Sequence, residues 1–93
     1  MSKSILQKEK ECWACHTRFN LHEHHVIYGT ANRKKSEKYG LKVWLCVHHH
    51  TGNAGVHNGN KQLDLELHQL AQRKFEEKYG HELFMNTFHK NWL

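Results

Sequence analysis

Apolar and polar positions in the first half of the chain follow patterns typical of short strands. Residues 19–28 are rich in aromatic and β-branched side chains, which predicts an extended segment that ends at Gly29. Residues 41–46 alternate apolar and polar at first and are rich in strand formers, which predicts a second strand paired with the first as a hairpin. The stretch between them, residues 30–39, is polar and basic. It predicts a loop, either alone or with a helical turn that begins at Ser36.

The second half of the chain carries a helical pattern. After the turn-prone residues 51–55, a helix begins or resumes near His57. From about Gln62, apolar residues recur on one helix face, and Gly80 is well placed to follow the helix end. These apolar positions are Leu63, Leu67, Leu70, Ala71, Phe75 and Tyr79. Residues 81–93 predict a short final helix whose aromatic side chains close the core. The pattern therefore predicts a small α+β domain, with a β-hairpin and one or two C-terminal helices.

The chain has 93 residues, of which 38% are hydrophobic, so it has room for one domain with a thin core that needs further support. Residues 1–9 are polar and are expected to form a mobile lead, while residues 10–93 form the single domain. The lead contains no apolar stretch long enough for a signal segment or a membrane span. The three cysteines leave one over in any disulfide scheme, which favours a reducing compartment. We therefore expect a cytoplasmic protein with no membrane partner.

The charge balance favours a polyanionic partner. Lys and Arg number 14 against 9 Asp and Glu, for a formal net charge of +5. The candidate nucleic-acid contacts are Arg33, Lys34 and Lys35, and Arg33 is the strongest because a guanidinium holds a phosphate bidentately. Histidine is over-represented, with 11 copies, and imidazole is a common metal ligand. This excess points to metal chemistry.

Two pairs of residues have the spacing of a zinc site. Cys12 and Cys15 form the first pair, and Cys46 and His49 form the second about thirty residues later. Three thiolates and one imidazole complete a closed tetrahedron, which leaves no position for water and therefore serves folding rather than chemistry. Two neighbouring histidines compete with His49 for the fourth position, namely His48 and His50.

The remaining histidines of the region are His22, His24, His25, His50 and His57. With the two metal-spaced pairs, they resemble the HNH or ββα-metal nuclease family, especially its small zinc-knuckle versions from phages and bacteria. The resemblance covers roughly residues 12–57. In that family a metal ligand directly precedes the general-base histidine on the first strand, which matches His24 and His25. The family also places one histidine straight after the second zinc pair and another a few residues on, which matches His50 and His57.

The resemblance implies a small ββα-metal domain held by a structural Zn²⁺ and carrying a second divalent metal, such as Mg²⁺, Mn²⁺, Ni²⁺ or Zn²⁺. It implies that His24, His50 and His57 hold this catalytic metal and that His25 polarises the attacking water. The expected activity is an HNH-type endonuclease that cuts or nicks DNA with low intrinsic sequence specificity, leaving 5′-phosphate and 3′-hydroxyl ends. A protein partner or a homodimer would supply specificity. A phage-encoded protein of this kind would act in the host cytoplasm.

The chain departs from the family pattern at two places. The spacing from His50 to His57 is longer than one helical turn, and residues 39–41 stand where the family has its middle asparagine, for which Asn53 is a candidate substitute. His22 is an alternative to His24 as a ligand. The competing interpretation is a non-catalytic zinc-binding module that binds nucleic acid or a protein partner.

Overall fold

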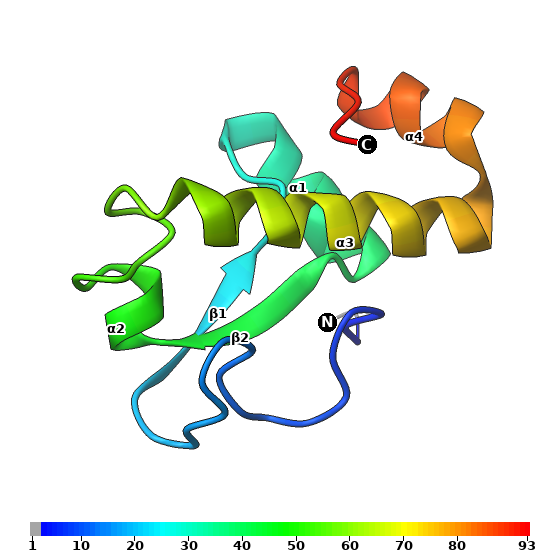
Figure 1. Ribbon diagram of the computed structural model, residues 1–93. Coiled ribbons are helices and arrows are strands. Elements are labelled where there is room, and N and C mark those ends of the chain that lie inside the picture. The colour runs from blue at the N-terminus through cyan, green and yellow to red at the C-terminus, as the bar shows by residue number, and fades with distance from the viewer. Residues whose placement is uncertain (1–2) are drawn as a thin grey trace.

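Two antiparallel strands form the centre of the fold (Figure 1). The computed structural model of the chain describes residues 3–93. In it, β1 (Leu21–His25) pairs with β2 (Lys42–Cys46), so that Leu21 lies opposite Cys46 and His25 lies opposite Lys42. The predicted α+β class and the antiparallel strand pair are confirmed, although the first strand is shorter than the predicted extended segment.

The connection between the strands is a helix, α1 (Thr30–Tyr39), so the prediction of a loop with a turn from Ser36 is wrong. Ala, Arg, Lys and Glu are good helix formers, and Gly40 ends the helix in the left-handed conformation. Ser36 is the one buried residue of α1, and its hydroxyl donates a hydrogen bond to the carbonyl oxygen of Ile27 at 2.6 Å. A helix attached in this way has no apolar stripe, so hydrophobic periodicity gives no signal for it.

Three helices follow β2, namely α2 (Val47–His50), α3 (Lys61–Tyr79) and α4 (His81–Phe88). The long helix and its end before Gly80 are confirmed, and the final helix stops earlier than predicted. The N-terminus of α3 is capped by the Asn60 side chain, which accepts a hydrogen bond from the Leu63 N–H at 3.0 Å. None of the helices in residues 3–93 has the length and apolar character needed to cross a bilayer.

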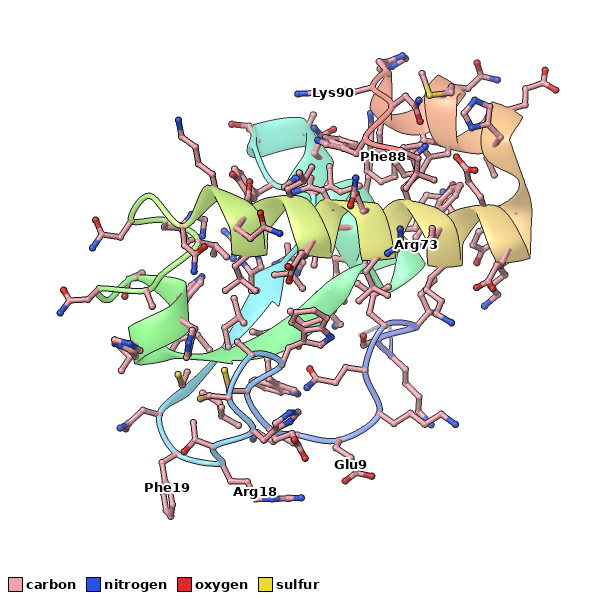
Figure 2. All side chains as sticks on the ribbon, viewed as in Figure 1. Glu9, Arg18, Phe19, Arg73, Phe88 and Lys90 are labelled. Carbon is pink, nitrogen blue, oxygen red and sulfur yellow. The ribbon has the colours of Figure 1, made fainter. Side chains whose placement is uncertain are left out.

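The core lies between the strand pair and the buried face of α3, and it continues under α4 (Figure 1). Phe75 and Phe84 are fully buried with ring centroids 5.4 Å apart, and Figure 2 shows Phe88 where α4 approaches α3. The largest fully buried apolar side chains are Phe75, Phe84, Ile27, Leu41, Leu45 and Leu67. The strands are therefore fixed against a single core.

Residues 3–9, expected to form most of the mobile lead, lie along β2. The Ser4 hydroxyl donates to the Lys42 carbonyl at 2.5 Å, and the Ile5 N–H donates to the Gly40 carbonyl at 2.9 Å. The Gln7 side-chain oxygen accepts from the Trp44 N–H at 2.8 Å. These contacts give β2 partners on the side away from β1. Residues 1–2 of the expected lead lie outside the described residues.

Two candidate metal centres

The first centre joins the N-terminal loop to β2 and α2. We call it the cysteine–histidine cluster, and its members are Cys12, Cys15, Cys46 and His49, with ligand atoms all within 4.8 Å of one another. The Cys46 and Cys12 sulfurs lie 3.3 and 3.8 Å from Nδ1 of His49, and the Cys15 sulfur lies 3.8 Å from the Cys46 sulfur. Metal–sulfur bonds of about 2.3 Å in a tetrahedron give edges of about 3.8 Å. The spacing therefore fits a four-ligand metal site.

Local backbone contacts bring the two halves of this cluster together. The His16 N–H donates to the Cys12 carbonyl at 2.8 Å, which closes the turn that carries both cysteines of the first pair. The Trp13 N–H donates to the Trp44 carbonyl at 2.8 Å and ties that turn to β2. In Figure 2, sulfur atoms gather where the N-terminal loop passes α2. His49 completes the group, whereas His48 and His50 are not members of it.

The thiol groups of the cluster influence one another. Burial raises the pKa of Cys12, but backbone N–H groups of Cys46, Cys15 and Ala14 outweigh it, so the net pKa is lowered. At Cys15 the Thr17 N–H lowers the pKa, but burial and the neighbouring sulfurs outweigh this, so the net pKa is raised. Ionising all three sulfurs at this distance requires a cation between them.

The second centre, which we call the three-histidine cluster, consists of His24 from β1, His50 from α2 and His57 from the following loop. Their ligand nitrogens all lie within 4.8 Å of one another, and the ring centroids of His50 and His57 are 4.8 Å apart. His24 is 2% exposed, and its Nε2 is buried without a hydrogen-bond partner among the described residues. A buried nitrogen in this state calls for a partner, such as a water or an ion. His22 lies at the exposed edge of the cluster, with its Nδ1 3.0 Å from Nδ1 of His50.

The long spacing from His50 to His57 is taken up by a loop. The N–H of His57 donates to the His50 carbonyl, and the N–H of Val56 donates to the His49 carbonyl, both at 3.0 Å. A Cβ on Gly55 would lie 2.6 Å from the His50 carbonyl oxygen, so only glycine permits this approach. Thr51 and Asn53 of this loop are exposed, whereas Gly55 and Val56 are buried. The insertion therefore leaves the two imidazoles adjacent.

The buried imidazole of His24 and the half-buried imidazole of His50 both favour the neutral form. Burial, followed by the neighbouring imidazoles of His50 and His57, lowers the pKa of His24 to about 3. Burial also lowers the pKa of His50, with further contributions from His57 and His22. Neutral imidazole is the form that binds a metal, so His24 and His50 have the required lone pairs at pH 7.

A cavity of about 300 Å³ connects the three-histidine cluster to His25 and Arg33, and Glu23 and Tyr28 complete its lining. His25 follows His24 on β1, where successive side chains point to opposite faces, yet both line this cavity. Its Nε2 lies 3.0 Å from a carboxylate oxygen of Glu37 on α1. The cavity thus combines a metal-type donor set, a further imidazole and a guanidinium.

The basic residues of α1 divide between two surfaces. Arg33 and Lys34 line a second hollow of about 650 Å³, which shares His25 and Arg33 with the first cavity. Lys35 points elsewhere, because its ammonium donates to the Thr87 carbonyl of α4 at 2.7 Å. Figure 2 shows Arg18 and Phe19 at the outer end of the loop before β1, on the side away from α3. The basic residues of α1 that line the cavity or the hollow beside it are therefore Arg33 and Lys34.

Sequence reasoning missed Glu37 and Asp64 as neighbours of the site. Glu37 lies in a stretch expected to be a loop, and Asp64 approaches from α3, where its carboxylate accepts a hydrogen bond from the Tyr28 hydroxyl at 3.2 Å. Both contacts join residues far apart in the chain, and no local sequence motif predicts them.

Comparisons with protein-family models, curated proteins and solved structures gave no match. The centres are therefore judged on their own geometry.

Proposed function

We propose that this chain is a metal-dependent nuclease that hydrolyses DNA phosphodiester bonds. The observation that supports this most directly is the buried, unpartnered Nε2 of His24 beside His50 and His57, in a cavity that His25 also lines. In the proposal, the three-histidine cluster holds a divalent metal and His25 is the general base. The cysteine–histidine cluster holds Zn²⁺ and stabilises the fold.

The three-histidine cluster fits a catalytic metal by its chemistry. Three protein ligands leave coordination positions open, unlike the four-ligand cluster. Imidazole suits Mn²⁺, Ni²⁺ and Zn²⁺ better than it suits Mg²⁺, which prefers oxygen. When bound, such a metal supplies Lewis-acid stabilisation of the phosphate oxygens and of the departing 3′ oxygen.

The residues of the chain have separate roles in the hydrolysis. His25 takes a proton from water as the water oxygen bonds to phosphorus and the bond from phosphorus to the 3′ oxygen breaks. The 3′ oxygen gains a proton from solvent, which gives 5′-phosphate and 3′-hydroxyl ends. Arg33 lines the cavity and holds the phosphate through its guanidinium. Lys34 continues the positive surface along α1. These contacts go to phosphate, so low sequence specificity is expected.

Plasmid cleavage tests the proposal. We expect the wild-type chain to convert supercoiled plasmid to nicked or linear forms with Mn²⁺, Ni²⁺ or Zn²⁺, and His25→Ala to reduce the rate by about 10²–10⁴-fold. His48→Ala is the matched control, because His48 is an exposed α2 histidine outside both clusters. Metal analysis should find two metals per wild-type chain and one in His57→Ala.

The nuclease proposal is refuted if neither wild type nor His25→Ala cuts the plasmid. This outcome counts only for protein that is folded and holds one chelator-resistant zinc. Salt-sensitive DNA binding without cleavage would then identify the chain as a non-catalytic zinc-binding module.

A further inference from the structure

The side chain of His25 is held by a carboxylate that the sequence pattern does not reveal. Oε1 of Glu37 lies 3.0 Å from Nε2 of His25, and the His25 side chain is only 13% exposed. We propose that Glu37 is the positioning residue of the general base, a proposal that rests on the function proposed above. It fixes which ring nitrogen of His25 is available to accept a proton.

The chemistry of the two partners determines the tautomer. An ionised carboxylate only accepts hydrogen bonds, so the Nε2 atom of a neutral His25 must carry the hydrogen. Nδ1 then keeps its lone pair, and it is the nitrogen that takes the proton from water. Once that proton is transferred, the Glu37 carboxylate stabilises the resulting imidazolium by its opposite charge. Orientation and charge both act through this single hydrogen bond.

The Glu37 carboxylate is itself held in place. Its second oxygen, Oε2, accepts a hydrogen bond from the ammonium of Lys42 at 2.9 Å, and Lys42 is 4% exposed. The two oxygens of Glu37 therefore face two different partners. Burial lowers the pKa of Lys42, but Glu37 and Glu23 outweigh this and raise it, so the lysine stays charged. The neighbouring residue on α1, Ser36, anchors the helix to the Ile27 carbonyl.

Glu23, His25 and Glu37 also bring possible metal-ligand atoms within 4.8 Å of one another. The Lys42 ammonium lies 2.9 Å from Glu37 and 3.4 Å from Glu23 and already supplies the positive charge between these carboxylates. The group is accordingly an ion-pair network that supports His25, and the metal belongs to the three-histidine cluster.

Steady-state kinetics separates positioning from structural support. We expect Glu37→Ala to lower kcat by about 10–10³-fold, with little change in KM. This loss is smaller than the one expected for His25→Ala, which removes the base itself. Glu37→Gln keeps an oxygen that accepts from Nε2–H but loses the negative charge, so it should recover only the part of the Glu37→Ala loss that comes from orientation. In a His25→Ala background, Glu37→Ala should change kcat by less than about twofold, because both residues act through one step. Glu23→Gln removes the negative charge of the other Lys42 partner and should affect kcat much less than Glu37→Ala.

The proposal is overturned if the kcat losses of His25→Ala and Glu37→Ala multiply in the double variant. It is also overturned if Glu23→Gln lowers kcat as much as Glu37→Ala does. An activity-independent readout is the ¹⁵N NMR spectrum of the His25 ring in zinc-loaded protein. Wild type and Glu37→Gln should show protonated Nε2 and unprotonated Nδ1, and Glu37→Ala should show a tautomer mixture. A wild-type ring protonated at Nδ1 alone would refute the positioning role. Absence of cleavage by wild type with any metal would instead refute the nuclease, and the NMR result would still test the hydrogen bond.

Discussion

Removal of the metal from the cysteine–histidine cluster is expected to unfold the domain. Residues 10–20 form an irregular loop in which Cys12 is the only buried residue and Trp13 and Ala14 are partly buried against the core. Beyond the cluster, the loop is held to the sheet region by backbone hydrogen bonds such as Trp13 to Trp44 and Val47 to Asn20. We therefore expect the loop to depend on a metal bound in the cluster for its place against β2.

The magnitude of the effect follows from comparing two free energies. Cysteine- and histidine-rich zinc sites contribute apparent binding free energies of about 10–16 kcal/mol at pH 7. A domain of this size has a total free energy of unfolding of about 5–14 kcal/mol, at roughly 0.05–0.15 kcal/mol per residue. The metal contribution is thus as large as the whole stability. The metal-free chain should lack the native fold at 25 °C.

Far-UV circular dichroism and tryptophan fluorescence measure this outcome, because Trp13 and Trp44 lie beside the cluster and are joined by a backbone hydrogen bond. Stripping the metal with a strong chelator should abolish the cooperative thermal transition, and added Zn²⁺ should restore it. The matched control is His57→Ala, which removes a ligand of the three-histidine cluster and should leave the transition in place. A verified metal-free chain with a native spectrum and a Tm within about 5 °C of the loaded protein would refute the reasoning.

Two further predictions concern α1. Arg33→Ala, made in a His25→Ala background, should weaken DNA binding in anisotropy titrations and reduce the slope of log K against log[salt] by about 1. Lys35→Ala in the same background should leave the slope unchanged, because the Lys35 ammonium binds the Thr87 carbonyl. Equal slopes in the two variants would contradict the assignment of the DNA surface. Gly40→Ala should lower the free energy of unfolding by more than the roughly 1–2 kcal/mol of left-handed backbone strain, because its Cβ would lie 2.3 Å from the Lys3 carbonyl oxygen. Gly59→Ala, which also has a positive φ (89°) and open space among the described residues, is the control, and equal losses in urea denaturation would argue against that contact.

The sequence predicts those features of the site that depend on short spacing. The members of each pair, Cys12 with Cys15 and Cys46 with His49, have two residues between them, so one turn of backbone brings each pair together. The long helix is equally local, because its apolar residues recur at helical spacing and Asn60 caps it. Local geometry determines these features, and a pattern in the sequence reports them.

Features that depend on distant contacts were not predictable. The polar sequence of α1 gives no hydrophobic periodicity that would predict a helix, because the helix is attached through the buried Ser36. The carboxylate of Glu37 reaches His25 only because that helix forms. The family resemblance predicts His57 beside His50, but no local pattern predicts the backbone hydrogen bond across the 51–56 loop that brings them together. No composition or periodicity specifies these contacts, because each one needs the tertiary fold already in place.

The two metal centres are mechanically connected through β2 and α2. His49 belongs to one cluster, and the next residue, His50, belongs to the other, so the position of one ligand constrains its neighbour. A register slip of one residue between β1 and β2 would exchange the faces of His24 and His25 and so separate the ligand from the base. Cys46, at the end of β2, ties the strand to the N-terminal loop and opposes such a slip. In the proposed nuclease, the cysteine–histidine cluster would therefore support the three-histidine cluster by fixing its geometry, although its four ligands leave no coordination position for substrate.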